Sequence, residues 1–267
     1  MNFTFVCNDE LNIILNFLPL THIYPIRLLN KYFNEFIETD FILENFVHCR
    51  MNHKIIKKNS KHLQKIVLYE SDNLTDDCLV NCNKLNILNL PFNTQITNNG
   101  LKHIPNAKFI NLNSNINITD DGLKHISKIR ILYLDNDTSI TNDGLKYIPN
   151  VQYLSLRDNK YITDDGLKYI PNINELRLRW NENITDNGLK HISNIKLLDL
   201  YNNQKITNEG LKYIPQVYIL DMHFNKNITK NGLKHIKNTL LSMNGGYYRF
   251  ADQNYVPLLY KKHCQYF

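Results

Sequence analysis

Hydrophobic and polar positions along most of the chain repeat every 22 residues. Around one threonine in each repeat the unit has the pattern LxxLxLxxNxxITDxGLKxIPx. The threonines that mark the period are Thr75, Thr97, Thr119, Thr141, Thr163, Thr185, Thr207 and Thr229. Self-similarity at a fixed period of about 20–50 residues is typical of solenoids, in which each repeat is one supersecondary unit.

The unit that starts at Val151 shows which elements the pattern predicts. Leu154 and Leu156 alternate with neighbours that we expect to be exposed, as in a short strand. Thr163 is a natural helix N-cap, and the two aspartates after it suit the positive end of the helix dipole. Pro171 cannot continue a helix because it lacks an N–H group. Each unit is therefore expected to be a strand followed by about two turns of α or 3₁₀ helix.

A single unit of this kind cannot fold alone. Its six apolar anchors contribute roughly 12 kcal/mol, whereas fixing the backbone costs about 1–2 kcal/mol for every residue. Neighbouring units must supply the difference by stacking their strands around a shared core. Seven units match the pattern well, and a weaker one precedes them with Leu63, Ile66 and Leu68 in the strand positions. The pattern stops after Leu241, so we expect residues 245–267 to form a C-terminal cap.

A column of asparagines is the polar counterpart of the leucines. Its members are Asn93, Asn115, Asn159, Asn181, Asn203 and Asn225. Because an amide has two donor hydrogens and an acceptor, a stacked column can satisfy backbone groups of successive turns. Asp137 interrupts the column with a carboxylate that only accepts, so we expect a weak point there that Asp137→Asn would remove.

These residues carry a resemblance to the leucine-rich-repeat superfamily over about residues 63–244. The half that reads ITDxGLK resembles the cysteine-containing subclass common in F-box proteins, shortened to 22 residues. The resemblance implies an α/β solenoid of strand-plus-short-helix repeats over residues 51–244.

Residues 1–50 lie outside the repeat and contain helical patterns, among them an i, i+3, i+4, i+7 stripe from Leu11 to Leu18. The string DELNIILNFLPLTHIYPIRLLNKYFNEFI resembles an F-box, the small helical domain that binds the Skp-family adaptor of cullin–RING ubiquitin ligases. The whole chain is similar to the F-box/leucine-rich-repeat proteins of giant DNA viruses of amoebae. By resemblance, the adaptor contact would involve Leu18, Pro19, Leu20, Leu28, Leu29 and Phe33.

The charge of +6 has a simple source in the repeat. One helix position holds seven lysines, without which acidic residues would exceed basic ones by one: Lys102, Lys124, Lys146, Lys168, Lys190, Lys212 and Lys234. We interpret them as a solvated outer face, which makes a nucleic-acid partner an unfavoured alternative. Five cysteines without paired CxxC spacing favour neither disulfides nor zinc, and Cys78 and Cys82 occupy core positions of the repeat. No apolar run reaches the length of a membrane span, and the start of the chain does not look like a signal peptide. We therefore expect a cytoplasmic or nuclear location, which would be the host cytoplasm if the protein is viral.

The positions that flank the inner leucines of each strand point away from the core, and they do not repeat. Arg, Trp and Tyr, the residue types most enriched at binding hot spots, gather on adjacent strands of this concave face. The predicted partner-binding residues are Tyr133, Tyr153, Arg157, Arg177, Arg179, Trp180 and Tyr201. The alternative is that Trp180 covers the edge of the core and that the arginines pair with Glu175, Asp158 and Asp199.

The chain shows no nucleophile–base arrangement, no phosphate-binding glycine loop and no convincing metal-ligand set, so we expect neither catalysis nor a cofactor nor a metal. The leading hypothesis is a substrate-recognition subunit of an SCF-type ubiquitin ligase, with a protein substrate on the concave face. The alternative is a non-catalytic binding scaffold or inhibitor unrelated to ubiquitin, because Cys7-Asn8 stand where the F-box family opens with Leu-Pro.

Overall fold

The computed structural model describes residues 56–57, 60–68, 74–136 and 139–236, and the backbone of strands within 240–258. The F-box-like segment 1–50 lies outside the described residues, as does Asp137 in the asparagine column. The predicted adaptor contacts that therefore remain predictions are Leu18, Pro19, Leu20, Leu28, Leu29 and Phe33.

The strands that the pattern predicts stack into one parallel sheet in chain order. They are β1 (Lys65–Val67), β2 (Ile87–Asn89), β3 (Phe109–Asn111), β4 (Ile131–Tyr133), β5 (Tyr153–Ser155), β6 (Glu175–Arg177), β7 (Leu197–Asp199) and β8 (Ile219–Asp221). Equivalent repeat positions pair across every step, so that Leu154 pairs with Leu176 and Leu176 with Leu198. The weak first unit is confirmed as part of the solenoid, because β1 pairs in parallel with β2.

A short helix follows most strands and is shorter than the sequence suggests, with one α-helical turn in place of about two. The α-helices are α4 (Asn98–Leu101), α5 (Asp120–Leu123), α6 (Asn142–Leu145), α7 (Asp164–Leu167), α8 (Asp186–Leu189) and α9 (Lys230–Leu233). The 3₁₀ segments are η1 (Ser60–His62), η2 (Asp76–Cys78), η3 (Lys190–Ile192) and η4 (Gly210–Tyr213). The chain has only 22 residues per unit in which to return to the next strand, so most helices end after the Gly-Leu pair.

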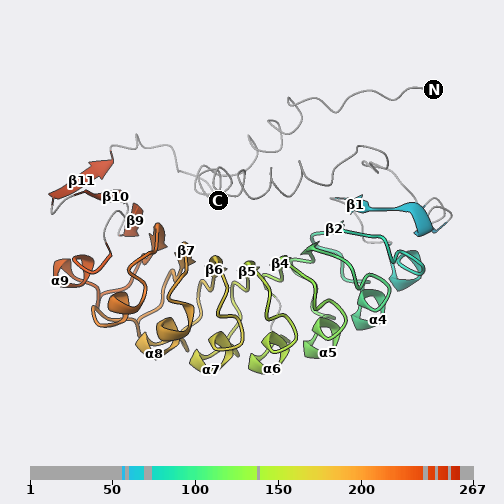
Figure 1. Cartoon of the computed structure of the whole chain (residues 1–267), viewed down its shortest axis with the longest axis horizontal. Helices are drawn as coiled ribbons and strands as arrows, with labels where there is room; N and C mark the ends of the chain where they lie inside the picture. The colour runs from blue at the N-terminus through green and yellow to red at the C-terminus, as the bar shows by residue number, and fades with distance from the viewer. Residues whose placement is uncertain are drawn as a thin grey trace. The chain divides into compact units, whose positions relative to one another are not determined.

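The stacked units curve into an arc with the strands on the inner, concave side and the helices on the outer, convex side (Figure 1). Adjacent strands are about 4.8 Å apart, whereas a helix with its side chains is about 10 Å wide. The helical side therefore needs more room for each repeat than the strand side, and the stack bends away from it. The side chains of the non-repeating positions consequently share one concave surface.

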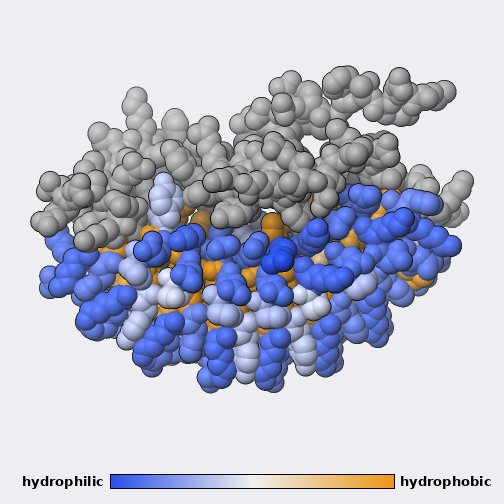
Figure 2. Space-filling model, in the orientation of Figure 1, coloured by the Kyte–Doolittle hydropathy of each residue, from blue (hydrophilic) through white to orange (hydrophobic). Residues whose placement is uncertain are grey.

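The core fills the space between strands and helices. Leucines and isoleucines of every repeat are almost fully inaccessible, including Leu154, Leu156 and Ile170 of the fifth unit. Hydrophilic residues dominate the outer side, and hydrophobic ones show in a band between helices and strands (Figure 2). Cys78 and Cys82 are buried free thiols, and burial raises the pKa of Cys82 to about 11, which confirms their packing role.

The asparagine column bridges successive repeats as expected. The Asn181 Nδ2 donates to the carbonyls of Asn159 and Ile162 in the preceding repeat, each at 2.9 Å. Its Oδ1 accepts from the backbone N–H of Asn183 at 2.8 Å and of Ile184 at 3.2 Å. One buried amide therefore satisfies four backbone groups that would otherwise lack partners.

A second ladder joins the helix starts, and the sequence did not suggest it. Thr141 donates to the Asp120 carboxylate of the preceding repeat from its N–H at 2.9 Å and from its Oγ1 at 2.6 Å. Thr141 also acts as the predicted N-cap by accepting from the N–H of Asp143. A Cβ at Gly144 would collide with the same Asp120 carboxylate, 2.9 Å from its Cγ. Glycine recurs at this position from Gly100 to Gly232, and this glycine column leaves room for the ladder.

Beyond the helical repeats the sheet continues at its C-terminal end. Strand β9 (Leu240–Met243) pairs in parallel with β8, and β10 (Gly246–Ala251) pairs antiparallel with β9 and with β11 (Asn254–Leu258). Of these strands, β10 and β11 fall within residues 245–267, where the sequence predicts a cap.

Candidate protein-binding face

One backbone position places its residue in the left-handed region in each repeat where that position is described. The position directly precedes the asparagine column, and φ is between 60° and 65° at its seven described members, Phe92, Ser114, Asn136, Asp158, Trp180, Asn202 and Phe224. Asn and Asp tolerate this region, but a bulky aromatic residue there is strained. Phe92, Trp180 and Phe224 are nevertheless 64%, 48% and 52% exposed. Aromatic side chains in a strained and solvent-facing position indicate a surface selected for contact rather than for folding.

Two of these aromatics join a cluster at the ends of β6–β8. The Tyr201 ring centroid lies 5.4 Å from that of Trp180 and 5.1 Å from that of Phe224, which it meets edge to face. His223 completes the group 5.8 Å from Tyr201, and its Nδ1 lies 2.7 Å from an Asp221 carboxylate oxygen. The cluster offers an aromatic surface, with Trp180 and Phe224 about half exposed, beside a half-buried polar base.

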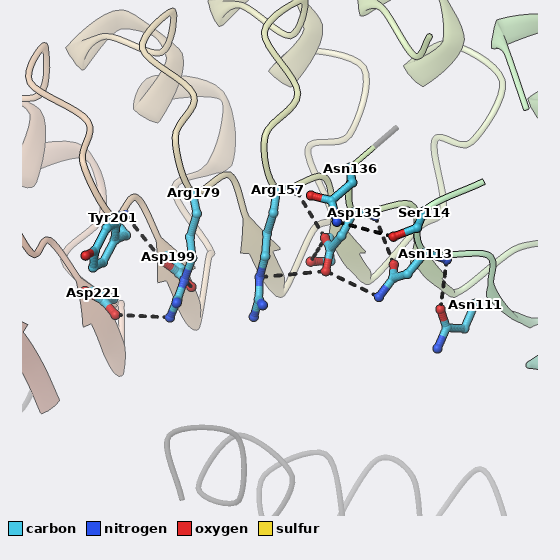
Figure 3. A network of polar contacts seen from close by, with 11 residues as sticks. Asn111, Asn113, Ser114, Asp135, Asn136, Arg157, Arg179, Asp199, Tyr201 and Asp221 are labelled. Carbon is cyan, nitrogen blue, oxygen red and sulfur yellow. Dashed lines mark hydrogen bonds and ion pairs between the residues drawn. The ribbon is translucent and has the colours of Figure 1, made fainter. Parts of the chain in front are cut away.

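Arg179 forms that base. Its Nε donates to the buried Asp199 carboxylate at 2.5 Å, and one of its terminal nitrogens lies 3.5 Å from Asp221 (Figure 3). Its guanidinium also lies over the Tyr201 ring, 5.4 Å from the centroid. Burial raises the pKa of Asp199, an effect that Arg179 opposes. Arg179 therefore holds two carboxylates and the aromatic ring in place.

Asp135 is the centre of a neighbouring polar network. It accepts from Ser155 Oγ at 2.5 Å and from the Arg157 backbone N–H at 3.1 Å, and the Arg157 Nε lies 3.8 Å away (Figure 3). Asn113 contributes a further bond from its Nδ2 at 3.4 Å. The network forms the floor of an open groove of about 400 Å³, which extends along this edge from Phe92 to Trp180.

A third group lies at the centre of the concave face. The ring centroids of Tyr133 and Tyr153 are 4.6 Å apart, and the Arg177 guanidinium lies 5.4 Å above the Tyr153 ring. Tyr153 and Arg177 are only 2% and 7% exposed. The Tyr153 hydroxyl, the Arg177 Nε and one oxygen of Glu175 are buried without hydrogen-bond partners. Burial raises the pKa of Glu175 to about 7, against the opposing charge of Arg177.

The structure thus divides the predicted contact residues into three adjoining groups. Tyr133, Tyr153 and Arg177 form one, Arg179, Trp180 and Tyr201 form another, and Arg157 belongs to the Asp135 network. Of the alternative pairings, only that of Arg179 with Asp199 is seen among the described contacts.

One expectation about the strand positions beside Leu154 was wrong. Tyr153 and Ser155, expected to be exposed beside the inner leucines, are buried because Tyr153 packs against its neighbours and Ser155 bonds to Asp135. Arg157 pairs with Asp135, a carboxylate that the alternative interpretation did not include.

Neither the part that Phe92 plays in the groove nor the left-handed backbone at its position was predicted from the sequence. A signal was present, because Asn, Asp and Ser fill the same position in four other repeats. Residues of this kind are enriched at positive φ, so they indicate a left-handed column in which Phe92, Trp180 and Phe224 stand out.

The outer face carries less free charge than its lysines suggest. Four lysines of the column pair with a carboxylate three residues earlier: Lys124 with Asp121, Lys146 with Asp143, Lys168 with Asp165, and Lys212 with Glu209. This arrangement is typical of a solvated helical surface and gives little support to a phosphate-binding track.

The described residues lack the features of a metal site and of a membrane span. They contain no cluster of three or more His, Cys, Asp or Glu side chains that could hold a metal ion. Among the described helices, none has the length and apolar character needed to cross a membrane.

Part of the chain matches a known family, and solved structures share its fold. The family described as Leucine Rich repeat matches residues 147–170, 169–193 and 191–214. No curated protein matches the sequence. Among solved structures, an internalin C2 from Listeria monocytogenes is similar with a TM-score of 0.59 and 21% identity, over 70% of this chain and 84% of that one.

Two further structures share the fold. Yeast Rad7, solved in a complex with Elc1, gives a TM-score of 0.53 at 17% identity, over 73% of this chain and 65% of its own. TLR13, solved in a complex with ssRNA13, gives 0.53 at 18% identity, over 70% of this chain and 31% of its own. At these identities the likeness establishes the architecture alone. The chain carries leucine-rich repeats, and its described residues fold as a leucine-rich-repeat solenoid.

Proposed function

We propose that this protein is a substrate receptor, in which the concave face binds a partner protein and the N-terminal segment binds a Skp-family adaptor of a cullin–RING ubiquitin ligase. The observation that carries the binding role is the exposure of Trp180 and Phe224 in a strained left-handed backbone beside Tyr201. Such strain costs on the order of 1 kcal/mol per residue, which folding alone gives no reason to retain.

The choice of a protein partner rests on the chemistry of the face. Aromatic and arginine side chains over a fixed polar base are the composition of protein hot spots. Aspartates and a glutamate are interspersed among the arginines, and Asp135 and Asp199 lie in the middle of the surface. Because these carboxylates offset the charge of the arginines, the face attracts a nucleic-acid backbone less than a free arginine cluster would, so a protein surface fits better.

The ligase role rests on the F-box resemblance of residues 9–37. In this role the protein supplies proximity between a bound substrate and the ubiquitin-conjugating machinery, and it needs no catalytic residue of its own. A location in the cytoplasm or nucleus follows from the proposal, since the adaptor and its cullin act there.

Two variants separate the two contacts. Phe33→Asp should abolish co-purification of a Skp-family adaptor and leave binding of the substrate protein intact. Trp180→Ala should abolish binding of the substrate protein and leave adaptor binding intact. Tyr161→Ala is a matched control, because Tyr161 is 57% exposed and belongs to none of the three groups on the concave face. A folded full-length chain that fails to bind the adaptor at micromolar concentration contradicts the ligase role.

A scaffold or inhibitor unrelated to ubiquitin is the second candidate, favoured by Cys7-Asn8 in place of the opening Leu-Pro of the F-box family. It predicts that removal of residues 1–50 changes neither partner binding nor partner turnover. The ligase role predicts that the same truncation leaves binding intact but slows turnover of the partner.

A further inference from the structure

The open groove along the ends of the strands has an exposed aromatic ring at each end. Phe92 lies at one end and Trp180 at the other, and both side chains are about half exposed or more. Between them the left-handed column continues through Ser114, Asn136 and Asp158, which also line the groove. These positions share one backbone conformation, so their side chains leave the chain in the same direction. The groove is therefore an accessible track across the strands.

The track has the length of a short extended segment. Phe92 and Trp180 are four repeats apart in the sequence. Adjacent strands are about 4.8 Å apart, so the two rings are separated by roughly 19 Å. An extended chain advances about 3.3 Å per residue, and about six residues span this distance. Because side chains alternate along an extended chain, residues six apart point to the same side, and one segment can contact both rings.

The charges that line the groove are compensated except for one carboxylate. Arg157 lies beside the Asp135 carboxylate, and Arg179 is held by two carboxylates of the next strands. Asp158 is exposed and lines the groove, and it forms no ion pair within the described part of the chain. The groove is therefore negative although the whole chain is positive, since the lysine column belongs to the helical side.

Asp158 lies directly beside Trp180. The Asp158 N–H donates at 3.0 Å to the carbonyl of Arg179, the residue before Trp180. The φ angle is 62° at Asp158 and 61° at Trp180, so the carboxylate and the indole ring leave adjacent repeats side by side. Their backbones are about 5 Å apart, as in any pair of adjacent strands. A cation that enters the groove at this point can meet the ring and the carboxylate together.

The concave face already uses contacts between cations and aromatic rings. The Arg179 guanidinium lies 5.4 Å from the Tyr201 ring centroid, and that of Arg177 lies 5.4 Å from the Tyr153 ring centroid. Trp180 has the ring type that attracts cations most strongly, yet none of the described cations lies over it. Tyr201 packs against it at 5.4 Å between centroids, and the open half of its surface faces solvent.

Resting on the proposed protein-binding role, we propose that this groove binds an extended segment of the partner protein, with a Lys or Arg side chain between the Asp158 carboxylate and the Trp180 ring. The cationic group donates to the carboxylate and lies over the indole. From there the segment crosses Asn136 and Ser114 and reaches Phe92 with an apolar side chain. An acidic segment fits poorly, because Asp158 repels it.

Selection from a library of random twelve-residue peptides displayed on phage, against the full chain, tests the proposal. Trp180 is the only tryptophan in the sequence, so a change in its fluorescence shows that a peptide without tryptophan binds at the groove. We expect these peptides to share a Lys or Arg. Replacing that residue by methionine, which keeps an unbranched side chain, should weaken binding to the wild-type chain about tenfold.

Asp158→Asn removes the charge without straining the backbone, because Asn136 holds the same left-handed position in the preceding repeat. In this variant the methionine replacement should weaken binding by less than about threefold, since only the contact with the ring remains. Asp165→Asn is the matched control. It removes an exposed carboxylate on the helical side, where Asn187 holds the equivalent position, and should keep the tenfold effect.

The remaining outcomes separate this site from the protein-binding role. The cation site is overturned if the peptides that change Trp180 fluorescence share no Lys or Arg, or if the methionine replacement weakens binding equally in Asp158→Asn and the wild type. A reduced effect in Asp165→Asn also overturns it, because the charge would then act from a distance. All three outcomes leave the protein-binding role standing. Selection of no peptide that changes Trp180 fluorescence contradicts both.

Discussion

Gly144→Ala tests whether the bonds between helix starts hold the repeats together. In the wild-type chain Asp120 receives two hydrogen bonds from Thr141, and a Cβ at Gly144 would displace that carboxylate. Hydrogen bonds to a charged group contribute about 1.5–3 kcal/mol each, so the loss is about 3–6 kcal/mol. Alanine in place of glycine within a helix raises the free energy of unfolding by about 1 kcal/mol, because alanine has the higher helix propensity. We therefore expect Gly144→Ala to lower the free energy of unfolding by about 3 kcal/mol.

The matched background is Asp120→Ala, in which the carboxylate is already absent. There the new Cβ meets Leu123 Cδ1 at 3.2 Å, which a small side-chain shift relieves. Gly144→Ala should then be neutral or stabilise the fold by about 1 kcal/mol through helix propensity. Urea titration followed by circular dichroism gives all four free energies of the cycle. An equal cost of Gly144→Ala in both backgrounds would refute the explanation of the glycine column.

Three further predictions follow from single residues. The contribution of Glu175 to the free energy of unfolding should fall by about 2.5 kcal/mol between pH 5 and pH 8, because the folded state keeps its proton up to a pKa of about 7 while the unfolded state loses it near 4.5. Urea titrations of the wild type and of Glu175→Gln should therefore differ by this amount in their change with pH, and an identical pH dependence would contradict the burial argument. Asn181→Ala should lower the free energy of unfolding by at least about 3 kcal/mol, because buried backbone groups lose their partners. Asn183→Ala removes an exposed hydrogen bond to the Lys160 carbonyl and should lower it by less than about 1 kcal/mol. Equal losses in the two variants would argue against the role of the buried column. Ser114→Gly should raise the thermal midpoint by relieving about 1 kcal/mol of strain at φ 63°, and a lower midpoint would argue against that strain.

The repeating part of the fold could be predicted from the sequence because each of its positions has one physical task. The spacing of Leu154, Leu156 and Asn159 fixes strand, core and turn in every unit, and the structure places them as expected. The bond from Thr141 to Asp120 was not foreseeable in the same way, since it spans 21 residues and depends on how neighbouring units are offset.

The concave face was predictable in composition but not in pairing. The non-repeating arginine, tyrosine and tryptophan positions lie in three adjoining groups on the concave face. Which arginine takes Asp199 depends on side-chain conformation, and the structure gives it to Arg179 rather than to the register partner Arg177. As a result the Arg177 Nε has no hydrogen-bond partner among the described residues, and no sequence pattern indicates this.

Hydroxyl-radical footprinting of the full chain, with and without a captured partner, tests most directly whether the concave face is the binding surface. Aromatic side chains on both sides of the solenoid serve as reporters, because Trp180 and Phe224 belong to the concave cluster and Tyr213 to the helical column. The partner should protect Trp180 and Phe224 and leave Tyr213 unchanged. Protection of Tyr213 with unchanged Trp180 and Phe224 would place the binding surface on the helices and contradict the proposed role of the concave face.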